Sequence, residues 1–473
     1  MATTKESRSA TAGAGIAASL RRRIAGTVIA PPDTAYAEAR QVWNGVVDRY
    51  PAAIVRPAGA HDVAATVLFS REHGLPLAVR GGGHNAAGFG TCDGGLVVDL
   101  GSLNGVDFDP RAGTATAGGG STWSAVDHAT QAHGLAVTGG MVSHTGIGGL
   151  TLGGGIGNLM RRCGLTCDNL AGAELVTAGG STIDVNDEDH ADLLWALRGG
   201  GGNFGVVTRF TYRLHAIGPT VLAGMLVHPI ADGAEVLRFY RDWADSLPDE
   251  MTTVVALRTA PPSPHLPAEI HGRPIVAIAV CWSGALDEGD AVLEPLRRFR
   301  RPAADLITRK PYVDHQKMFD PSAPFGRGNY KRHANLGALS DDVIEVLVDH
   351  TARVTSPHSV TLIFQLGGQV ARIHEDATAY SDRGARFNVD VNAQWLEPRD
   401  PNAERHVRWA QDLHAELKPF ASRQAYVNFL TDEGPERLRL AYGEAKYGRL
   451  AALKQTYDPD NVLRINQNIA PAG

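Results

Sequence analysis

Three glycine-rich clusters constrain the fold of this chain more than any other feature of its sequence. They lie at residues 81–83, 139–157 and 199–205, and nine of the nineteen residues of the second cluster are glycine. No collagen-like period accompanies the 54 glycines, so they are expected at backbone bends and close approaches. Glycine also lets backbone N–H groups surround an anion. Three converging clusters would form a groove for an extended, phosphate-bearing ligand; the alternative is that they form only tight turns and close strand packings.

The first cluster matches the dinucleotide-binding pattern G-x-G-x-x-A, but its context excludes a Rossmann site. That pattern must open a helix that leads the chain back to a parallel strand. Only twelve residues separate Ala86 from Asp99, and four of them are glycine, so no crossover helix fits. The third cluster fails the same test because a strand is expected directly after it. No G-K-[ST] P-loop occurs in the chain.

The composition is that of an ordinary globular protein. Hydrophobic residues make up 43% of the chain and charged residues 20%, and the net charge of −6 disfavours a nucleic-acid-binding protein. The polar N-terminus and the lack of a long apolar run disfavour a secretory signal and a membrane span. We therefore expect a cytoplasmic enzyme without a nucleic-acid or membrane partner.

The four cysteines are too few for a disulfide scaffold. Cys163 and Cys167 have a spacing that could suggest a metal site, but no second pair of cysteines or histidines follows them. Buried thiols and no metal are therefore expected.

Hydrophobic patterning predicts an α+β protein. In the first half, strands are expected at residues 52–55, 76–79, 96–100, 106–109, 113–117, 175–177, 182–185 and 204–214, and helices at 61–73, 121–133 and 193–198. The first two strands and the helix between them predict a small β-α-β unit.

The glycine clusters end near residue 216, and the second half predicts a separate α+β domain with an antiparallel sheet. Strands are expected at residues 275–280, 360–366 and 387–395, and helices at 234–244 and 340–353. A strand at 425–429 and one long helix at 435–457 are expected near the C-terminus. The predicted boundaries are a flexible leader at 1–30 with room for one short helix, a first domain at 31–215, a second at 216–420 and a C-terminal segment at 421–473.

Six segments of this chain resemble the FAD-linked oxidases of the berberine-bridge-enzyme-like group. They are VRGGGH at 79–84, GIGGLTLGGG at 146–155, GLTCDNL at 164–170, WALRGGGGNFGVVT at 195–208, YVNF at 426–429 and YDPDNV at 457–462. The resemblance implies a vanillyl-alcohol-oxidase (PCMH-type) fold. In that fold, two α+β subdomains bind FAD, and an α+β substrate domain with an antiparallel sheet precedes a C-terminal segment that returns to the FAD domain.

The resemblance also implies which residues contact FAD. These are Arg80, Gly81, Gly82, Gly83, His84, Asn85, Gly139, His144, Thr145, Gly146, Gly149, Gly153, Gly154, Gly155, Asp168, Asn169, Gly202, Asn203, Phe204, Gly205, Val206, Asn428 and Asn466.

His84 is the residue that the resemblance implies to be bonded to the flavin 8α-methyl group. An isolated histidine is usually structural, but this one follows an apolar strand and three glycines, which would present its imidazole to whatever the loop holds. A neutral imidazole is a competent nucleophile when a neighbour holds its second nitrogen. Many members add a cysteine link just before the segment that matches 146–155; the aligned residue here is Val142, so no second, cysteinyl link is expected.

The candidate catalytic residues are Tyr426, Asn428 and Asp390, and the candidate substrate contacts are Gln365, Asn392 and Tyr330. Tyr426 is the leading base by resemblance to sugar-oxidising relatives, with a packed tyrosine as the alternative. A tyrosine of ordinary pKa, near 10, would need a flavin or a cation beside it to act as a base. Asp390 and Asn392 alternate onto one face of a strand, which would line a pocket or form the wet side of the sheet.

The implied reaction is hydride abstraction from an alcohol or amine by FAD, followed by reoxidation with dioxygen to hydrogen peroxide. One alternative is an FAD-dependent dehydrogenase that uses another electron acceptor. The other is a non-catalytic ligand-binding protein on a flavin fold.

Overall fold

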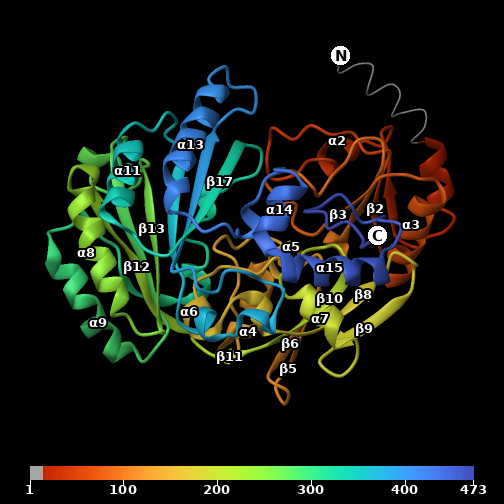
Figure 1. Cartoon of the computed structure of the whole chain (residues 1–473), viewed down its shortest axis with the longest axis horizontal. Helices are drawn as coiled ribbons and strands as arrows, with labels where there is room; N and C mark the ends of the chain where they lie inside the picture. The colour runs from red at the N-terminus through yellow and green to blue at the C-terminus, as the bar shows by residue number, and fades with distance from the viewer. Residues whose placement is uncertain (1–13) are drawn as a thin grey trace.

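The computed structural model describes residues 14–473, which form two α+β domains lying side by side along the longest axis of the molecule (Figure 1). The N-terminal domain holds two sheets and the glycine clusters. The second domain holds one large sheet, and the last fifty residues return to the N-terminal domain.

The first sheet has the strand order β1-β2-β4-β3, with β1 (Thr27–Ile29), β2 (Ala53–Arg56), β3 (Leu77–Arg80) and β4 (Leu96–Asp99). The helix α3 (Ala60–Glu72) joins β2 to β3, and both strands run parallel to β4, which lies between them. The predicted β-α-β unit is therefore present, with a third strand inserted into it.

The expected flexible leader at 1–30 is wrong for its second half. Residues 14–20 are helical, Leu20 is fully buried in the core of this subdomain, and β1 pairs antiparallel with β2. Apolar side chains at Ala17 and Leu20 give this segment a face to bury. The remainder of the predicted leader, 1–13, lies outside the described residues.

The second sheet is antiparallel, with the order β5-β6-β10-β8-β9. Its strands are β5 (Val106–Asp109), β6 (Thr114–Gly118), β8 (Leu170–Val176), β9 (Thr182–Asn186) and β10 (Val206–Arg213). The shorter elements of this domain are α2 (Tyr36–Ala39), α4 (Trp123–Gln131), β7 (Leu135–Ala136), α5 (Ile147–Leu152), α6 (Met160–Cys163), α7 (Ala191–Leu197) and β11 (His215–Ala216). Both predicted hairpins are confirmed, and β11 pairs with β7, so this domain extends through residue 216.

The second domain is built on one antiparallel sheet with the order β15-β12-β14-β13-β18-β19-β17, and β16 also pairs with β12. The strands are β12 (Thr220–Pro229), β13 (Met251–Thr259), β14 (Pro274–Trp282), β15 (Ala304–Asp305), β16 (Thr308–Pro311), β17 (Gly328–Leu336), β18 (Val360–Gln365) and β19 (Phe387–Trp395). The helices are α8 (Gly233–Asp245), α9 (Leu286–Phe299), α10 (Tyr312–His315), α11 (Asp341–Ala352), α12 (Gln369–Arg372) and α13 (Ala403–Leu417).

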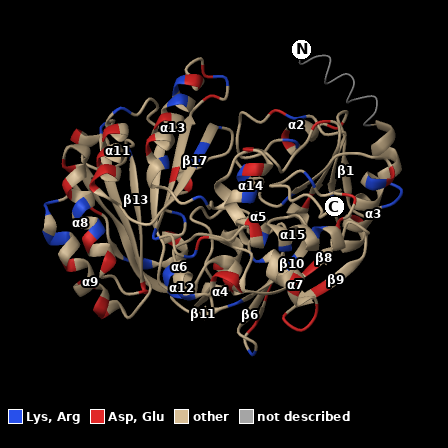
Figure 2. Cartoon of the chain, in the orientation of Figure 1, with Lys and Arg blue, Asp and Glu red and all other residues tan. Residues whose placement is uncertain are grey.

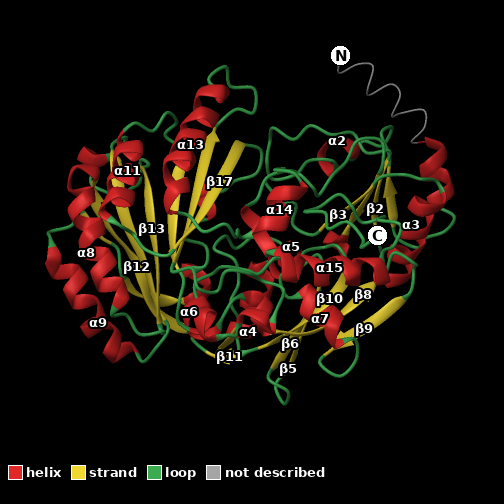
Figure 3. Cartoon of the chain, viewed as in Figure 1, coloured by secondary structure: helices red, strands yellow, loops and turns green. Residues whose placement is uncertain are grey.

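Four of these helices, α8, α9, α11 and α13, lie on the outer face of the sheet (Figure 3). The apolar residues of β19 on that face, Val389 and Val391, belong to the core between sheet and helices. The opposite face of the sheet is left for the N-terminal domain. Positions of Lys and Arg and positions of Asp and Glu are intermixed along the helices in view (Figure 2).

Two expectations for the C-terminal segment are wrong. Residues 427–429 form a short 3₁₀ turn in place of a strand, and the long helix is broken into α14 (Pro435–Tyr442) and α15 (Glu444–Tyr457). Gly443 lies between them with φ +75°, a conformation that ends a helix and that glycine adopts without strain. Both helices pack on the core of the N-terminal domain through Leu438 and Leu450.

Within residues 14–473, no helix has both the length and the apolar character that a membrane crossing requires.

Candidate active site

A cavity of about 360 Å³ lies where the N-terminal domain, the inner face of the second domain's sheet and the C-terminal segment meet. Sixteen of the predicted site residues line it. They are Arg80, Gly81, Gly82, Gly83, His84, Asn85, Thr145, Gly146, Gly149, Gly202, Gly205, Asp390, Asn392, Tyr426, Asn428 and Asn466.

The glycine clusters converge on this cavity. A Cβ atom added to Gly82 would come within 2.3 Å of the Gly146 backbone nitrogen, so the first two clusters touch each other. Gly149 and Gly202 line the cavity, and a Cβ atom on either would meet nothing within 4 Å. The absence of side chains there keeps the space beside the backbone open for a ligand.

Several predicted cofactor contacts lie outside the cavity lining. They are Gly139, Gly153, Gly154, Gly155, Asp168, Asn169, Asn203, Phe204 and Val206. Asp168 forms a buried ion pair with Arg383, Asn203 donates to backbone carbonyls, and Phe204 is fully buried in the core. A Cβ atom on Gly153 would collide with Asn428 Oδ1, so this glycine serves the approach of Asn428.

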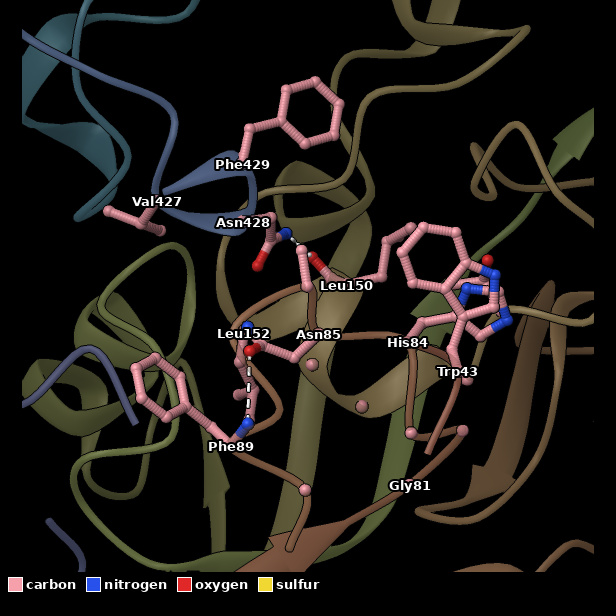
Figure 4. Close-up of a pocket in the computed structure, with 18 of the residues that line it drawn as sticks. Trp43, Gly81, His84, Asn85, Phe89, Leu150, Leu152, Val427, Asn428 and Phe429 are labelled. Atoms are coloured by element: carbon pink, nitrogen blue, oxygen red, sulfur yellow. Dashed lines mark hydrogen bonds between the residues drawn. The ribbon is translucent and has the colours of Figure 1, made fainter. Parts of the chain in front are cut away.

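His84 stands at one end of the cavity, beside Trp43 (Figure 4). The two rings stack with their centroids 5.5 Å apart, and His84 Nε2 lies 2.8 Å from Nδ1 of His144. Burial lowers the pKa of His84 to about 3, with smaller contributions from His144 and Lys331, so its imidazole is neutral at physiological pH. No hydrogen bond from the described residues engages Nδ1 of His84. His144 does not line the cavity itself, but its contact with Nε2 holds His84, which does.

Val142, the residue that the family resemblance aligns with a linking cysteine, lines the cavity. The four cysteines of the chain are all buried and free, and none of them lines the cavity.

Tyr426 points its hydroxyl group at the backbone of the second glycine cluster. The oxygen accepts hydrogen bonds from the backbone N–H of Gly155 at 2.9 Å, from that of Ile156 at 3.3 Å and from Asn428 Nδ2 at 2.9 Å. Asn428 also donates to the carbonyl of Leu150 (Figure 4). Burial raises the pKa of Tyr426 to about 12 despite these donors, so the group is a neutral phenol near pH 7. The turn, not strand periodicity, brings Tyr426 and Asn428 together.

Asp390 and Asn392 project into the cavity from β19, as their alternation predicts. Lys331 Nζ donates to Asp390 Oδ2 at 2.7 Å and lies 4.8 Å from the centre of the Phe429 ring. The second carboxylate oxygen of Asp390, Oδ1, is buried and has no partner among the described residues.

Gln365 and Tyr330 were predicted as substrate contacts, but the structure places neither of them in the cavity lining. Gln365 donates to the backbone carbonyl of Ala244 at the end of α8, and the Tyr330 hydroxyl accepts from Gln411 on α13. Both therefore face the helix layer. Because strand side chains alternate, their neighbours Phe364 and Lys331 line the cavity instead.

Sequence reasoning missed four lining residues that shape the site: Trp43, Arg258, Lys331 and Gln467. Lys331 is adjacent to a predicted contact, so strand alternation was a usable signal. Trp43, Arg258 and Gln467 lie in segments without a motif, and no local pattern identifies them.

The residues present fit a cofactor with a hydrogen-bonding edge and an extended body. Three lining side chains, Asp390, Asn392 and Asn466, have a buried acceptor oxygen without a partner in the described part of the chain. Such oxygens are costly unless a ligand or water donates to them. No group of three or more His, Cys, Asp or Glu side chains within 14–473 could hold a metal ion.

Comparison with known families and proteins agrees with this geometry. Residues 51–186 match the FAD binding domain family, and residues 425–470 match the berberine and berberine like family. The chain is 33% identical over 434 residues to an FAD-linked oxidoreductase of Dictyostelium discoideum, a match that covers 91% of each chain. It is 29% identical over 473 residues to (R)-6-hydroxynicotine oxidase of Paenarthrobacter nicotinovorans, covering 95% of this chain and 98% of the relative.

Solved structures show the same architecture. The crystal structure of 6-hydroxy-D-nicotine oxidase from Arthrobacter nicotinovorans has a TM-score of 0.85 at 29% identity, covering 95% of this chain and 98% of that one. Xylooligosaccharide oxidase from Myceliophthora thermophila has a TM-score of 0.84 at 21% identity, covering 98% and 100%, and at that identity shows the fold alone. With a PCMH-type fold and both family matches in place, the chain belongs to the FAD-linked oxidoreductases of the berberine-bridge-enzyme-like family.

Proposed function

We propose that this enzyme is an oxidase of small-molecule alcohols or amines that carries FAD on His84. The observation that carries the proposal is the state of His84: a neutral imidazole at the cavity wall, held at Nε2 by His144 and free at Nδ1. Those are the requirements for a nucleophilic ring nitrogen. With Val142 in place of a cysteine, the proposed tether is single.

Bound FAD would supply a hydride acceptor for the substrate C–H bond and, through dioxygen, a route to hydrogen peroxide. The glycine backbones of the first two clusters would hold its body, and Asn466, with Oδ1 unpartnered, would accept a hydrogen bond from it. Trp43 packs on His84 and limits the orientations of its imidazole.

The proton of the substrate O–H or N–H group needs an acceptor within the cavity. We assign this role to Asp390, because Lys331 holds Oδ2 and leaves Oδ1 available. Tyr426 is a weaker candidate than the sequence suggested. Its high pKa, about 12, keeps it protonated, so it acts as a fixed hydrogen-bond donor or acceptor beside Asn428.

Acid precipitation of the purified protein tests the tether. We expect the yellow colour to stay with the pellet, and we expect His84→Ala to release the flavin or to contain none. His265→Ala, at an exposed position outside the cavity, is the matched control and should keep the colour in the pellet. Flavin released from the wild-type protein would contradict the assignment of His84.

Peroxide formation tests the oxidase reaction. We expect a panel of alcohols and amines to yield a substrate that releases peroxide in step with oxygen uptake. The second candidate function, a dehydrogenase, predicts slow reoxidation of the reduced enzyme by air in a stopped-flow experiment. A non-catalytic protein would show neither flavin reduction nor peroxide with any member of the panel.

Two substitutions distinguish the proton acceptors once a substrate is known. Asp390→Asn removes the carboxylate but keeps its shape, and we expect kcat to fall by about a hundredfold or more, the usual size of a general-base effect. Tyr426→Phe removes only the hydroxyl group and should cost about tenfold or less. A larger loss of kcat in Tyr426→Phe than in Asp390→Asn would identify Tyr426 as the proton acceptor.

A further inference from the structure

One charged residue of the cavity has no partner of opposite charge. Four lining residues carry charge: Arg80, Arg258, Lys331 and Asp390. Arg80 pairs with Asp99 at 2.9 Å, and Lys331 pairs with Asp390 at 2.7 Å. Within residues 14–473, no carboxylate lies within ion-pair distance of Arg258.

Only neutral oxygens hold the Arg258 side chain. Nη1 donates to the hydroxyl group of Ser322 at 2.6 Å and Nε donates to the backbone carbonyl of Thr259 at 3.2 Å, while Nη2 makes no hydrogen bond to the described residues. Burial and the nearby Arg327 both lower the pKa of Arg258. A guanidinium group nevertheless stays charged, so this cation is partly removed from water without a counter-charge.

Arg327, which lies outside the cavity lining, adds a second positive charge near Arg258. Arg327 donates to the side-chain oxygen of Gln394 at 2.6 Å and has no carboxylate partner in the described part of the chain. The pKa of His358 is lowered by burial and then by Arg327 and Arg258, so the two arginines act on the same region.

Strand register places Arg258 on the same wall of the cavity as Asn392 and Lys331. Arg258, Val360, Asn392 and Lys331 are paired across four adjacent strands, β13, β18, β19 and β17, and all four line the cavity. Adjacent strands are about 4.8 Å apart, so the row is about 14 Å long.

Arg258 donates a hydrogen bond to Ser322, and the next residue, Ala323, accepts one from the Trp43 indole through its backbone carbonyl. The Trp43 ring in turn stacks on His84. Arg258 is thus on the sheet wall near His84 and not in a glycine cluster, the backbone that suits a diphosphate.

We propose, building on the proposed function, that Arg258 binds a carboxylate group of the substrate and that the enzyme oxidises an organic acid with an apolar body. The free Nη2 and the shared Nη1 give a fork that matches the two oxygens of a carboxylate. Val360, the strand partner of Arg258, lines the cavity together with Leu362 and Phe319, and these three side chains would contact the apolar body. The bound anion supplies the counter-charge that the chain itself does not.

The test uses benzoate as a probe of the flavin-loaded enzyme and does not depend on turnover. Titration with sodium benzoate at constant ionic strength should perturb the visible flavin spectrum and raise the melting temperature, both with saturation. Arg258→Gln should weaken benzoate binding by about tenfold to a hundredfold, the range expected for hydrogen bonds to a charged group. Arg258→Lys keeps the positive charge but loses the two-pronged donor geometry, so its benzoate affinity should lie between those of wild type and Arg258→Gln.

Three controls make the result specific. Benzamide, neutral and of the same shape, should bind equally weakly to wild type and to Arg258→Gln. Arg111→Gln, at an exposed position in the β5–β6 turn, should leave benzoate binding unchanged. Phenyl phosphate tests the other anion that a guanidinium fork accepts, and tighter binding of it than of benzoate would overturn the assignment of a carboxylate.

No saturable benzoate effect, or an equal effect in wild type and Arg258→Gln, would overturn the proposal. Arg258-dependent benzoate binding in an enzyme that releases no peroxide would keep the anion site and refute the oxidase reaction alone.

Discussion

At the scale of the residue, charged groups taken out of water in this molecule are mostly compensated by a named partner. Arg383 of the second domain forms a buried ion pair with Asp168 of the N-terminal domain, and Lys454 forms one with Asp458 within the C-terminal segment. Buried charges without such partners are costly, so an unpaired one signals either a ligand or a shifted pKa. Arg258 is the first case, and Asp127 is the second.

Asp127 makes the stability of the protein depend on pH. The side chain is fully buried on α4, Oδ2 accepts one hydrogen bond from Gln316 at 3.1 Å, and Oδ1 has no partner among the described residues. Burial raises the pKa of Asp127 to about 7. An unfolded aspartate has a pKa near 3.9, so between about pH 4 and pH 7 the folded state binds the extra proton and stability falls as the pH rises.

We expect this loss to reach about 4 kcal/mol above pH 7, because each tenfold difference in proton affinity between the folded and unfolded states is worth about 1.4 kcal/mol. The Asp127→Asn variant has no titrating group at this position and should not show this loss of stability. Urea unfolding at pH 5 and pH 8 measures the difference: wild type should lose stability relative to Asp127→Asn between the two values. An identical stability difference at both pH values would show that Asp127 is ionised in the fold.

The same scale shows what the sequence could and could not say of the site. His84 follows a strand and a triple glycine, so local sequence was enough to place it on the cavity wall. Tyr330 was predicted to lie in the cavity, but Lys331 lines it instead. An error of one residue in the phase of a strand moves each side chain to the opposite face of the sheet. Arg258 and Trp43 belong to the site through contacts far apart in the chain, which no local pattern encodes.

At the scale of the element, most strands and helices agree with their hydrophobic periodicity, because the two faces of each have different neighbours. The second domain's sheet is the clearest case, with apolar residues of β19 against the helices and polar ones in the cavity. Two of the failures lie at residues 425–429 and 435–457. Apolar residues recur through both segments, but a turn and a single glycine decide the backbone there.

Two glycines of the C-terminal helices should respond in opposite ways to alanine. Gly443, between α14 and α15, has φ +75° and ψ 156°, a region that side chains strain, so Gly443→Ala should destabilise the protein by about 1–3 kcal/mol. Gly448 is exposed inside α15 with open space at its Cβ position, so Gly448→Ala should stabilise it by about 0.5–1 kcal/mol. Urea unfolding measures both, and equal signs would contradict the helix break.

At the scale of the whole molecule, the cavity exists only because two domains and the C-terminal segment are held together. Asn44 of the first domain bonds the backbone of Asn329 in the second, and Asn203 bonds the backbone around Gln467 and Ile469. Sequence predicted two domains and a C-terminal segment, since glycine content changes near residue 216. It could not predict their docking, which depends on side chains reaching across long stretches of chain.

Arg161 is the residue whose loss should separate the domains most directly. It projects from α6 of the N-terminal domain, is 6% exposed, and donates to the carbonyls of Leu247, Met251 and Leu366 in the second domain at 2.7–2.9 Å. Arg161→Leu would leave these three carbonyl groups without their donor, at about 1–3 kcal/mol for each that stays buried. We expect a loss of at least about 3 kcal/mol in urea unfolding, and less for Arg161→Lys, which keeps a donor.

Because Arg161 is outside the cavity lining, the flavin itself reports whether the loss loosens the domain contact. In Arg161→Leu, iodide should quench flavin fluorescence at urea concentrations too low to unfold the chain. Arg309→Leu, which removes an exposed pair with Asp290, is the control and should cost less than about 1 kcal/mol without added quenching. Equal quenching in Arg161→Leu and wild type would mean that the remaining contacts hold the two domains closed, and that Arg161 stabilises the fold without gating the cavity.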